Sequence, residues 1–192
     1  DSACKGTPVS ITNTTSGANL AYNWDFNASD LTYTPVGGLN TTLANDIATS
    51  TGVDFMKEGN NYIGFNLKSA FSLVRLEFGN SLSNVPVATN LGDLGGAVAS
   101  ANLDFKLYME GNQYYALYYN AFSQMTLLSF GTSLLNTPIA TPVTLPPGLF
   151  QTASNMDLAQ MGTDVVAAIA NTGGVVSIIN FGPSITNRSE ER

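Results

Sequence analysis

Apolar and polar residues alternate along most of this chain, in short runs that are separated by turn-forming residues. Successive side chains on a strand point to opposite faces, so this alternation predicts half-buried β-strands. One such strand is predicted at 8–14. A second is predicted at 20–26, where four large apolar side chains share one face: Leu20, Tyr22, Trp24 and Phe26. Residues 27–46 are rich in Thr, Asn and Gly and are expected to form loop, with at most one short strand.

From residue 48 onward, strand-like runs follow one another at short intervals. Helix-type periodicity is limited to Asp164–Ala170, where the β-branched residues favour a strand instead. We therefore expect an all-β fold. The predicted strands are Val53–Lys57, Asn61–Leu67, Phe71–Phe78 and Val85–Leu91, then Leu103–Met109, Gln113–Tyr119, Ser123–Phe130 and Thr137–Thr144, then Met156–Met161, Val165–Ala170 and Val175–Phe181.

A repeated motif divides these strands into three groups. The segment LEFGNSLSNVP at 76–86 returns as LSFGTSLLNTP at 128–138 and, more weakly, as INFGPSITN at 179–187. Its Phe-Gly pair begins at 78, 130 and 181, which is a step of 52 and then of 51 residues. Four short strands in about fifty residues match one blade of a β-propeller. We expect three blades, at about 45–100, 101–152 and 153–192, the last without its outer strand.

Three blades are fewer than the roughly four to eight of a closed propeller. Each blade has an apolar face that a neighbour must cover. Three arrangements satisfy this need: further blades in a longer parent chain, association of chains that closes the ring, or an open arc with capped ends. Because Asp1 resembles a processed start, we favour a portion of a longer protein.

Two stretches resemble parts of large secreted proteins of Bacteroidetes, of the type associated with gliding motility and type IX secretion. The string Leu-x-Phe-Gly-x-Ser-Leu-x-Asn-x-Pro-x-Ala-Thr at 76–89 and 128–141 is similar to the repeat of their propeller-like segments. Residues 3–14 and the sequence YNWDF at 22–26 resemble the first half of a PKD-type immunoglobulin-like sandwich. That family usually continues with Gly-Asp-Gly, whereas 27–30 read NASD, so 1–44 is expected to be a partial segment of this kind.

This resemblance implies a cell-surface or secreted module that serves adhesion or substrate capture, and it implies no catalytic residues. Composition points the same way: 11% of residues are charged and the net charge is −7, so nucleic acid and anionic membrane surfaces are disfavoured partners. No apolar stretch approaches the roughly 20 residues that span a bilayer. Cys4 is the one cysteine, either a free thiol or paired outside this chain.

Three aspartates, Asp54, Asp104 and Asp157, recur at what we predict to be one register, each between two apolar residues. In one interpretation their carboxylates converge at the mouth of a central channel on a cation or a sugar. In the other, each accepts backbone N–H groups of its own or the next blade, because a buried carboxylate needs partners. Repetition in every blade favours the second interpretation.

Aromatic side chains crowd the second repeat: Tyr108, Tyr114, Tyr115, Tyr118, Tyr119 and Phe122. Such rings stack on sugars, but more often they fill sheet surfaces, and packing is the favoured interpretation. Tyr118 and Tyr119 must face opposite ways, so one of them is a candidate for ligand contact, as is Tyr115.

The Phe-Gly pairs are assigned to structure: Phe78 and Gly79, Phe130 and Gly131, Phe181 and Gly182. Each Phe is expected to anchor the end of a third strand, and each Gly to allow a positive φ at the exit turn. The Asn of each motif, at 84, 136 and 187, is expected to cap the loop through side-chain to backbone hydrogen bonds.

Most enzyme templates fail on this sequence. The chain has no His, which excludes a Ser-His-Asp arrangement, and one Cys does not make a usual zinc site. A carboxylate pair for glycoside hydrolysis stays open, although Glu58 and Glu110 fall in predicted turns, where exposed charge is ordinary. No cofactor or metal is expected; calcium lacks its Asp-x-Asp-x-Asp-Gly loop.

We expect a noncatalytic extracellular binding or adhesion module of a larger bacterial surface protein, with a glycan or a protein as partner. The alternatives are a carbohydrate-active enzyme domain on a propeller and a purely structural spacer.

Overall fold

The computed structural model describes residues 50–68, 71–98, 102–120, 124–145, 149, 153–171 and 174–186. By its backbone contacts the chain divides into two units, Asp1–Gly37 and Gly38–Arg192, and every described strand belongs to the second. The immunoglobulin-like segment predicted at 1–44, with Cys4 and Trp24, lies outside the described residues.

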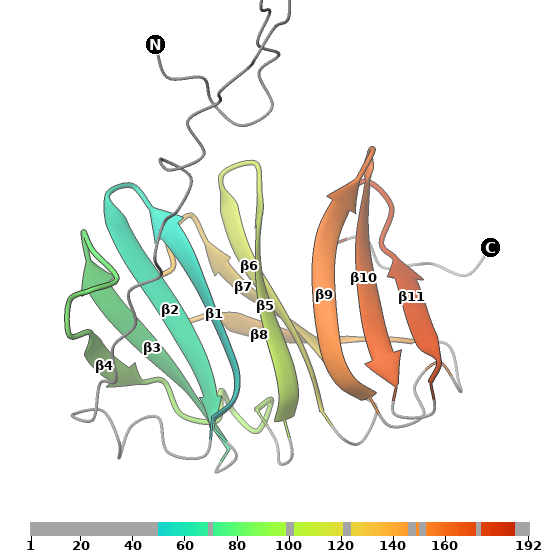
Figure 1. Ribbon diagram of the computed structural model, residues 1–192, viewed down its shortest axis with the longest axis horizontal. Helices are drawn as coiled ribbons and strands as arrows, with labels where there is room; N and C mark the ends of the chain where they lie inside the picture. The colour runs from blue at the N-terminus through green and yellow to red at the C-terminus, as the bar shows by residue number, and fades with distance from the viewer. Residues whose placement is uncertain are drawn as a thin grey trace, which may run out of the picture. The chain divides into compact units, whose positions relative to one another are not determined.

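The described strands form three antiparallel sheets (Figure 1), and in each sheet strands that follow one another in sequence are neighbours. The first sheet contains β1 (Ser50–Glu58), β2 (Asn61–Lys68), β3 (Ser72–Gly79) and β4 (Val87–Asn90). The second contains β5 (Asn102–Glu110), β6 (Gln113–Asn120), β7 (Met125–Gly131) and β8 (Ile139–Val143). The third contains β9 (Ala153–Met161), β10 (Asp164–Asn171) and β11 (Val176–Asn180). The structure has no helix in these residues, so the all-β prediction is confirmed.

Each strand predicted from residue 53 onward is present, with ends that differ from the prediction by at most three residues. The one run with helical periodicity, Asp164–Ala170, is strand β10. Its side chains alternate between buried and half-buried from Asp164 to Ile169, as period-two patterning requires. Val165, Val166 and Ile169 are β-branched and pack well on a pleated surface, which explains the choice of strand.

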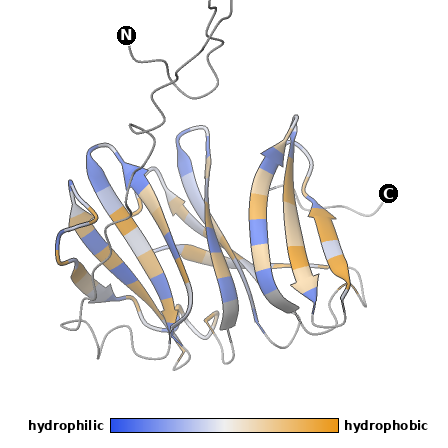
Figure 2. Ribbon diagram, in the orientation of Figure 1, coloured by the Kyte–Doolittle hydropathy of each residue, from blue (hydrophilic) through white to orange (hydrophobic). Residues whose placement is uncertain are grey.

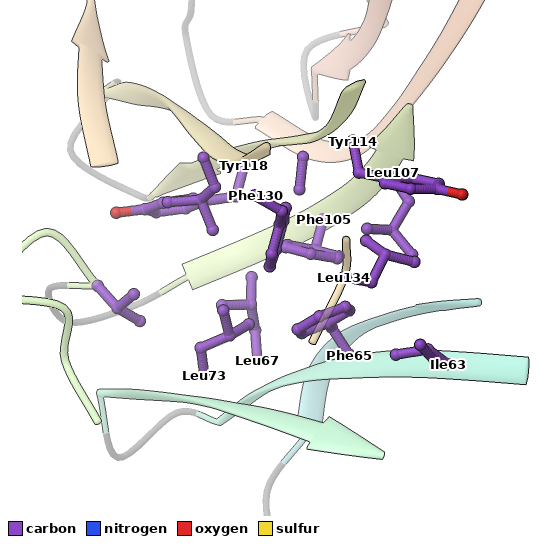
Figure 3. Close-up of a cluster of buried hydrophobic side chains, with 13 residues drawn as sticks. Ile63, Phe65, Leu67, Leu73, Phe105, Leu107, Tyr114, Tyr118, Phe130 and Leu134 are labelled. Carbon is purple, nitrogen blue, oxygen red and sulfur yellow. The ribbon is translucent and has the colours of Figure 1, made fainter. Parts of the chain in front are cut away.

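The first and second sheets bury an apolar core between them (Figure 3). Phe65 of β2 lies at its centre, with its ring centroid 4.8 Å from that of Phe130 and 6.0 Å from that of Phe105. Leu134, from the motif loop after β7, is fully buried in the same core. The whole set is Ile63, Phe65, Leu67, Leu73, Val98, Phe105, Leu107, Tyr114, Ala116, Tyr118, Leu128, Phe130 and Leu134.

A second core lies between the second and third sheets. Tyr119 and Met125 of the second sheet meet Val165 and Ile169 of the third, and Ile185 enters from the third motif loop. The strands that open the three sheets, β1, β5 and β9, lie side by side in that order. The second sheet therefore packs on both of its faces.

The two cores use corresponding faces of the sheets. We call the face that a sheet turns toward the preceding sheet its leading face, and the opposite one its trailing face. Tyr118 and Tyr119 are adjacent on β6 and lie on opposite faces, Tyr118 in the first core and Tyr119 in the second. The first sheet buries its trailing face in the first core, and the third sheet buries its leading face in the second core.

Candidate functional site

Two of the candidate aspartates join neighbouring sheets. Asp54 Oδ2 accepts the backbone N–H of Leu107 at 2.8 Å, and Asp104 Oδ2 accepts that of Met156 at 2.7 Å. In both residues Oδ1 accepts the N–H of the residue that follows, at 2.8 Å. Both carboxylates thus hold an edge strand of the next sheet, which agrees with the structural interpretation of these residues.

Asp157 differs from the other two. It lies exposed on the trailing face of the third sheet, and among the described residues its carboxylate accepts only the N–H of Leu158, at 3.0 Å. The predicted common register is also wrong. Asp54 and Asp157 precede the last residue of their strands by four positions, whereas Asp104 precedes Glu110 by six. β1 and β5 are both nine residues long, and Asp104 is the third residue of its strand whereas Asp54 is the fifth. The spacing of 50 residues between these two aspartates, against 52 for the Phe-Gly pair, reflects this difference.

Two glutamates make a parallel set of contacts. Glu58 Oε2 accepts the backbone N–H of Leu134 at 2.8 Å, and Glu110 Oε2 accepts that of Ile185 at 3.0 Å. The expectation that these are ordinary exposed turn charges is therefore wrong: they are the last residues of β1 and β5 and bind the motif loop of the next sheet. A signal was present, because Glu58 and Glu110 are 52 residues apart, the step of the Phe-Gly pair.

The motif loop of the second sheet is held from a further direction. Arg75 of β3 donates from Nη1 to the carbonyl oxygen of Leu135 at 2.6 Å, while its Nε pairs with Glu77 Oε1 at 2.9 Å. Glu58 and Arg75 therefore bind adjacent peptide groups of one loop. These charged side chains connect sheets and do not converge on a shared open site.

The Phe-Gly pairs have the geometry that the sequence predicts. Gly79, Gly131 and Gly182 have φ of 66°, 71° and 71°, in the left-handed region that favours glycine. Asn84 Nδ2 donates to the carbonyl of Phe78, and Asn136 Nδ2 to that of Phe130, each at 2.8 Å. Phe130 and Phe181 are buried, whereas Phe78 is half-buried. Asn187 lies outside the described residues.

The candidate tyrosines separate into two kinds. Tyr118 and Tyr119 are fully buried, so the expectation that one ring of the pair is available to a ligand is wrong. Burial raises the pKa of both phenols, most strongly for Tyr119, where the nearby Asp104 carboxylate adds to the effect. The side chain of Thr126 partly opposes the rise in the Tyr118 pKa. Tyr115 is half-buried and borders open space.

That open space is a pocket of about 650 Å³ between the second and third sheets. Tyr115 of β6 and the β7 residues Leu127 and Ser129 form one wall, and β11 with Phe181 forms another. Residues 141–145 of β8 and the chain after it complete the lining. Its lining residues with polar side chains are Tyr115, Ser129, Thr141, Thr144, Asn180 and Thr186. The Asn180 amide is already engaged, since its Nδ2 donates to Asp164 Oδ2 at 2.8 Å and its Oδ1 accepts the N–H of Gly182 at 2.6 Å.

The pocket has the character of a site for a neutral ligand. No charged side chain is among its described lining residues, and Asp54, Asp104 and Asp157 are not part of it. Sequence reasoning placed Tyr115 among the candidates, but it missed the partners of Tyr115, because β7, β8 and β11 meet only in three dimensions. Ser129, Thr141 and Asn180 carry no local signal that distinguishes them from other Ser, Thr and Asn of a polar chain.

Two further properties concern the described part of the chain. It contains no group of three or more His, Cys, Asp or Glu side chains placed to hold a metal ion. It also contains no helix of the length and apolar character needed to cross a membrane.

No family model matches this sequence. No curated protein matches it either. Among solved structures, the chain is similar to an exo-β-1,3-galactanase from Clostridium thermocellum, with a TM-score of 0.50 and 9% sequence identity. The similarity covers 73% of this chain and 33% of the galactanase chain, so this chain spans about a third of that protein's length. At this identity the likeness is one of fold.

Proposed function

We propose that this chain is a noncatalytic binding module that takes a neutral glycan in the pocket between its second and third sheets. The observation that carries the proposal is the lining of that pocket, which combines hydroxyl side chains with the ring of Tyr115 and no charged side chain among the described residues. Its volume of about 650 Å³ falls within the range of ligand sites.

The chemistry of a sugar suits such a lining. A sugar ring presents hydroxyl groups at its rim and apolar C–H groups on its faces, so it pairs with Ser, Thr and Asn side chains and packs on an aromatic ring. Tyr115 supplies the ring, while the hydroxyl groups of Ser129 and Thr141 supply donors and acceptors. An anionic ligand is disfavoured, because the chain carries a net charge of −7 and the pocket offers no cation.

The contacts of the carboxylates favour binding over catalysis. Glycoside hydrolysis needs two carboxyl groups that flank the scissile bond. Asp54, Asp104, Glu58 and Glu110 each accept backbone N–H groups of a neighbouring sheet, and none of them lines the pocket. The carbohydrate-active enzyme is therefore the weaker hypothesis.

The architecture and the setting belong to the same proposal. We take the three sheets as consecutive blades of a propeller-like array, supported by their repeated strand order and by the adjacent strands β1, β5 and β9. The resemblance of 76–89 and 128–141 to repeats of secreted Bacteroidetes proteins supports a place at the cell surface, and the lead-in at 1–44 is taken as partly immunoglobulin-like.

The proposal is tested by screening the chain against a panel of neutral glycans and measuring any hit by titration calorimetry. β-1,3-Galactan belongs in the panel, since the structurally similar protein is named for acting on it. Tyr115→Ala and Thr141→Val should each weaken binding about tenfold or more, as the loss of a stacked ring or a hydrogen bond does. Tyr62→Ala is the control, because Tyr62 is an aromatic of the first sheet outside the pocket.

Three results contradict the proposal. Binding that survives Tyr115→Ala unchanged places the glycan elsewhere. Release of sugar from a bound glycan makes the chain an enzyme. If a well-folded chain binds no neutral glycan of the panel, the remaining hypothesis is that the chain is a structural spacer.

A further inference from the structure

The leading face of the first sheet is exposed on β1 and at the motif loop, while Asn66, Val74 and Leu76 at its centre are buried. In the other two sheets the motif-loop end of this face is buried as well. Leu134 and Ile185, in the second and third motif loops, are 0% and 2% exposed, whereas Leu82 of the first loop is 51% exposed. On β1, Val53 and Phe55 are exposed, whereas their counterparts Phe105 and Leu107 on β5 are buried. On β1 and in its motif loop, the first sheet therefore exposes apolar side chains at positions that the second sheet buries.

A polar group on this face is also without a partner. In the second and third sheets the backbone N–H of the motif Leu or Ile donates to a glutamate of the preceding sheet. Among the described residues, none accepts the corresponding N–H of Leu82. Near it, Phe55 and Phe78 meet edge to face, with ring centroids 5.5 Å apart, over the buried Val74 and Leu76.

At the other end of the array, the trailing face of the third sheet is uncovered. Val176 of β11 occupies the position of Met125 on β7, which is buried; Val176 is 61% exposed. Met161 and Ile178 are also exposed on the third sheet, and Figure 2 shows β11 as a largely hydrophobic strand. A repeat that ends an array in water is expected to present a polar outer face, whereas this face exposes Met161, Val176 and Ile178 beside Asp157.

We propose that the third sheet of one copy of this chain packs on the first sheet of a second copy. The trailing face carrying Val176 would cover the leading face carrying Val53, Phe55 and Leu82, and so continue the interface that the chain makes twice internally. The occupant is a second copy because each chain bears both halves of this contact.

The contact is expected to be weaker than the internal ones. Met161 ends β9 at the position that Glu58 and Glu110 occupy in β1 and β5. A thioether is only a weak acceptor, so the N–H of Leu82 gains no carboxylate partner there. Burial of apolar surface carries the association, which makes it reversible and dependent on concentration.

Sedimentation velocity on the full chain tests the proposal, from about 1 to about 100 µM, where weak association is measurable. We expect a species of twice the chain mass at the upper end. Leu82→Asp and Val176→Lys, one on each face, should each raise the dissociation constant about tenfold or more, because a charge is buried without a matched partner. Ile139→Asp, on exposed β8, should leave it unchanged. Circular dichroism verifies that all three variants fold.

Mixing identifies the geometry of the contact. A Leu82→Asp chain retains an intact third sheet and a Val176→Lys chain an intact first sheet, so an equimolar mixture should contain more dimer than either variant forms alone at the same total concentration. A chain that stays monomeric at every concentration overturns the proposal. So does a dimer that Leu82→Asp abolishes and Val176→Lys leaves intact, because that pattern means a contact between two first sheets.

Discussion

The carboxylate of Glu58 accepts a hydrogen bond from the backbone N–H of Leu134 at 2.8 Å, across the boundary between the first and second sheets. Glu110 and Ile185 repeat this contact one sheet later. The strand that opens each of the first two sheets thus ends in a side chain that completes the motif loop of the next sheet. Repeats in such an array depend on their neighbours for polar contacts as well as for burial of apolar surface.

Asp104 and Asp157 predict contrasting effects on stability, because only Asp104 binds a strand of another sheet. Asp104→Ala removes the acceptor of the Phe105 and Met156 N–H groups and should lower the free energy of unfolding by about 1–3 kcal/mol. Asp157→Ala is the matched control, because Asp157 is exposed and accepts only from Leu158; it should cost about 0.5 kcal/mol or less. Urea denaturation measures both. Equal losses in the two variants would mean that the contact between sheets contributes nothing.

The motif phenylalanines predict a second contrast. Phe130 is 2% exposed and packs on Phe65, so Phe130→Ala should cost about 3–5 kcal/mol. Phe78 has the same place in the first motif but is half-buried on an uncovered face, so Phe78→Ala should cost about half as much or less. Chemical denaturation measures both variants below the concentration at which chains associate. A loss under about 1 kcal/mol for Phe130→Ala would show that its ring is not buried.

The buried tyrosines predict a loss of stability in alkali. Burial raises the pKa of Tyr118 and Tyr119 above their ordinary value of 10.0. The unfolded chain therefore releases these protons at a lower pH than the folded chain does. The stabilisation is present in full below pH 10 and declines as the pH rises above it, by up to about 1.4 kcal/mol per pH unit for each phenol. Tyr119→Phe should make the decline shallower in denaturation curves above pH 10. An unchanged slope in that variant would contradict the buried position of this phenol.

The strands could be predicted from sequence because their cause is local. Alternating side chains on β6 and β10, and turn residues at fixed steps, determine where a strand begins and ends. The Phe-Gly motif likewise placed Gly131 at a positive φ and Asn136 on the loop carbonyl, since both effects act within a few residues. The division of the chain into three similar units followed from the same repeats.

The contacts between sheets could not be predicted in the same way. Asp54 and Asp104 occupy different positions on β1 and β5, yet each binds a backbone N–H of the next sheet, and only the packing of the sheets reveals those contacts. Tyr115 lines a pocket while Tyr119, four residues along the strand, is buried, because the space around each is determined by the third sheet. Leu82 and Leu134 occupy the same position of the motif, but only Leu134 has a preceding sheet that packs on it among the described residues. The exposure of Leu82 therefore does not follow from its motif.

Hydrogen exchange at single backbone amides, followed by NMR, tests the link between sheets most directly. The amides of Leu134 and Ile185 should exchange slowly, because each donates to a glutamate of the preceding sheet. In Glu58→Ala, Leu134 should lose protection while Ile185, held by Glu110, keeps it. Rapid exchange of Leu134 in the unaltered chain, or protection that Glu58→Ala leaves in place, would contradict the joining of these sheets by carboxylate and amide.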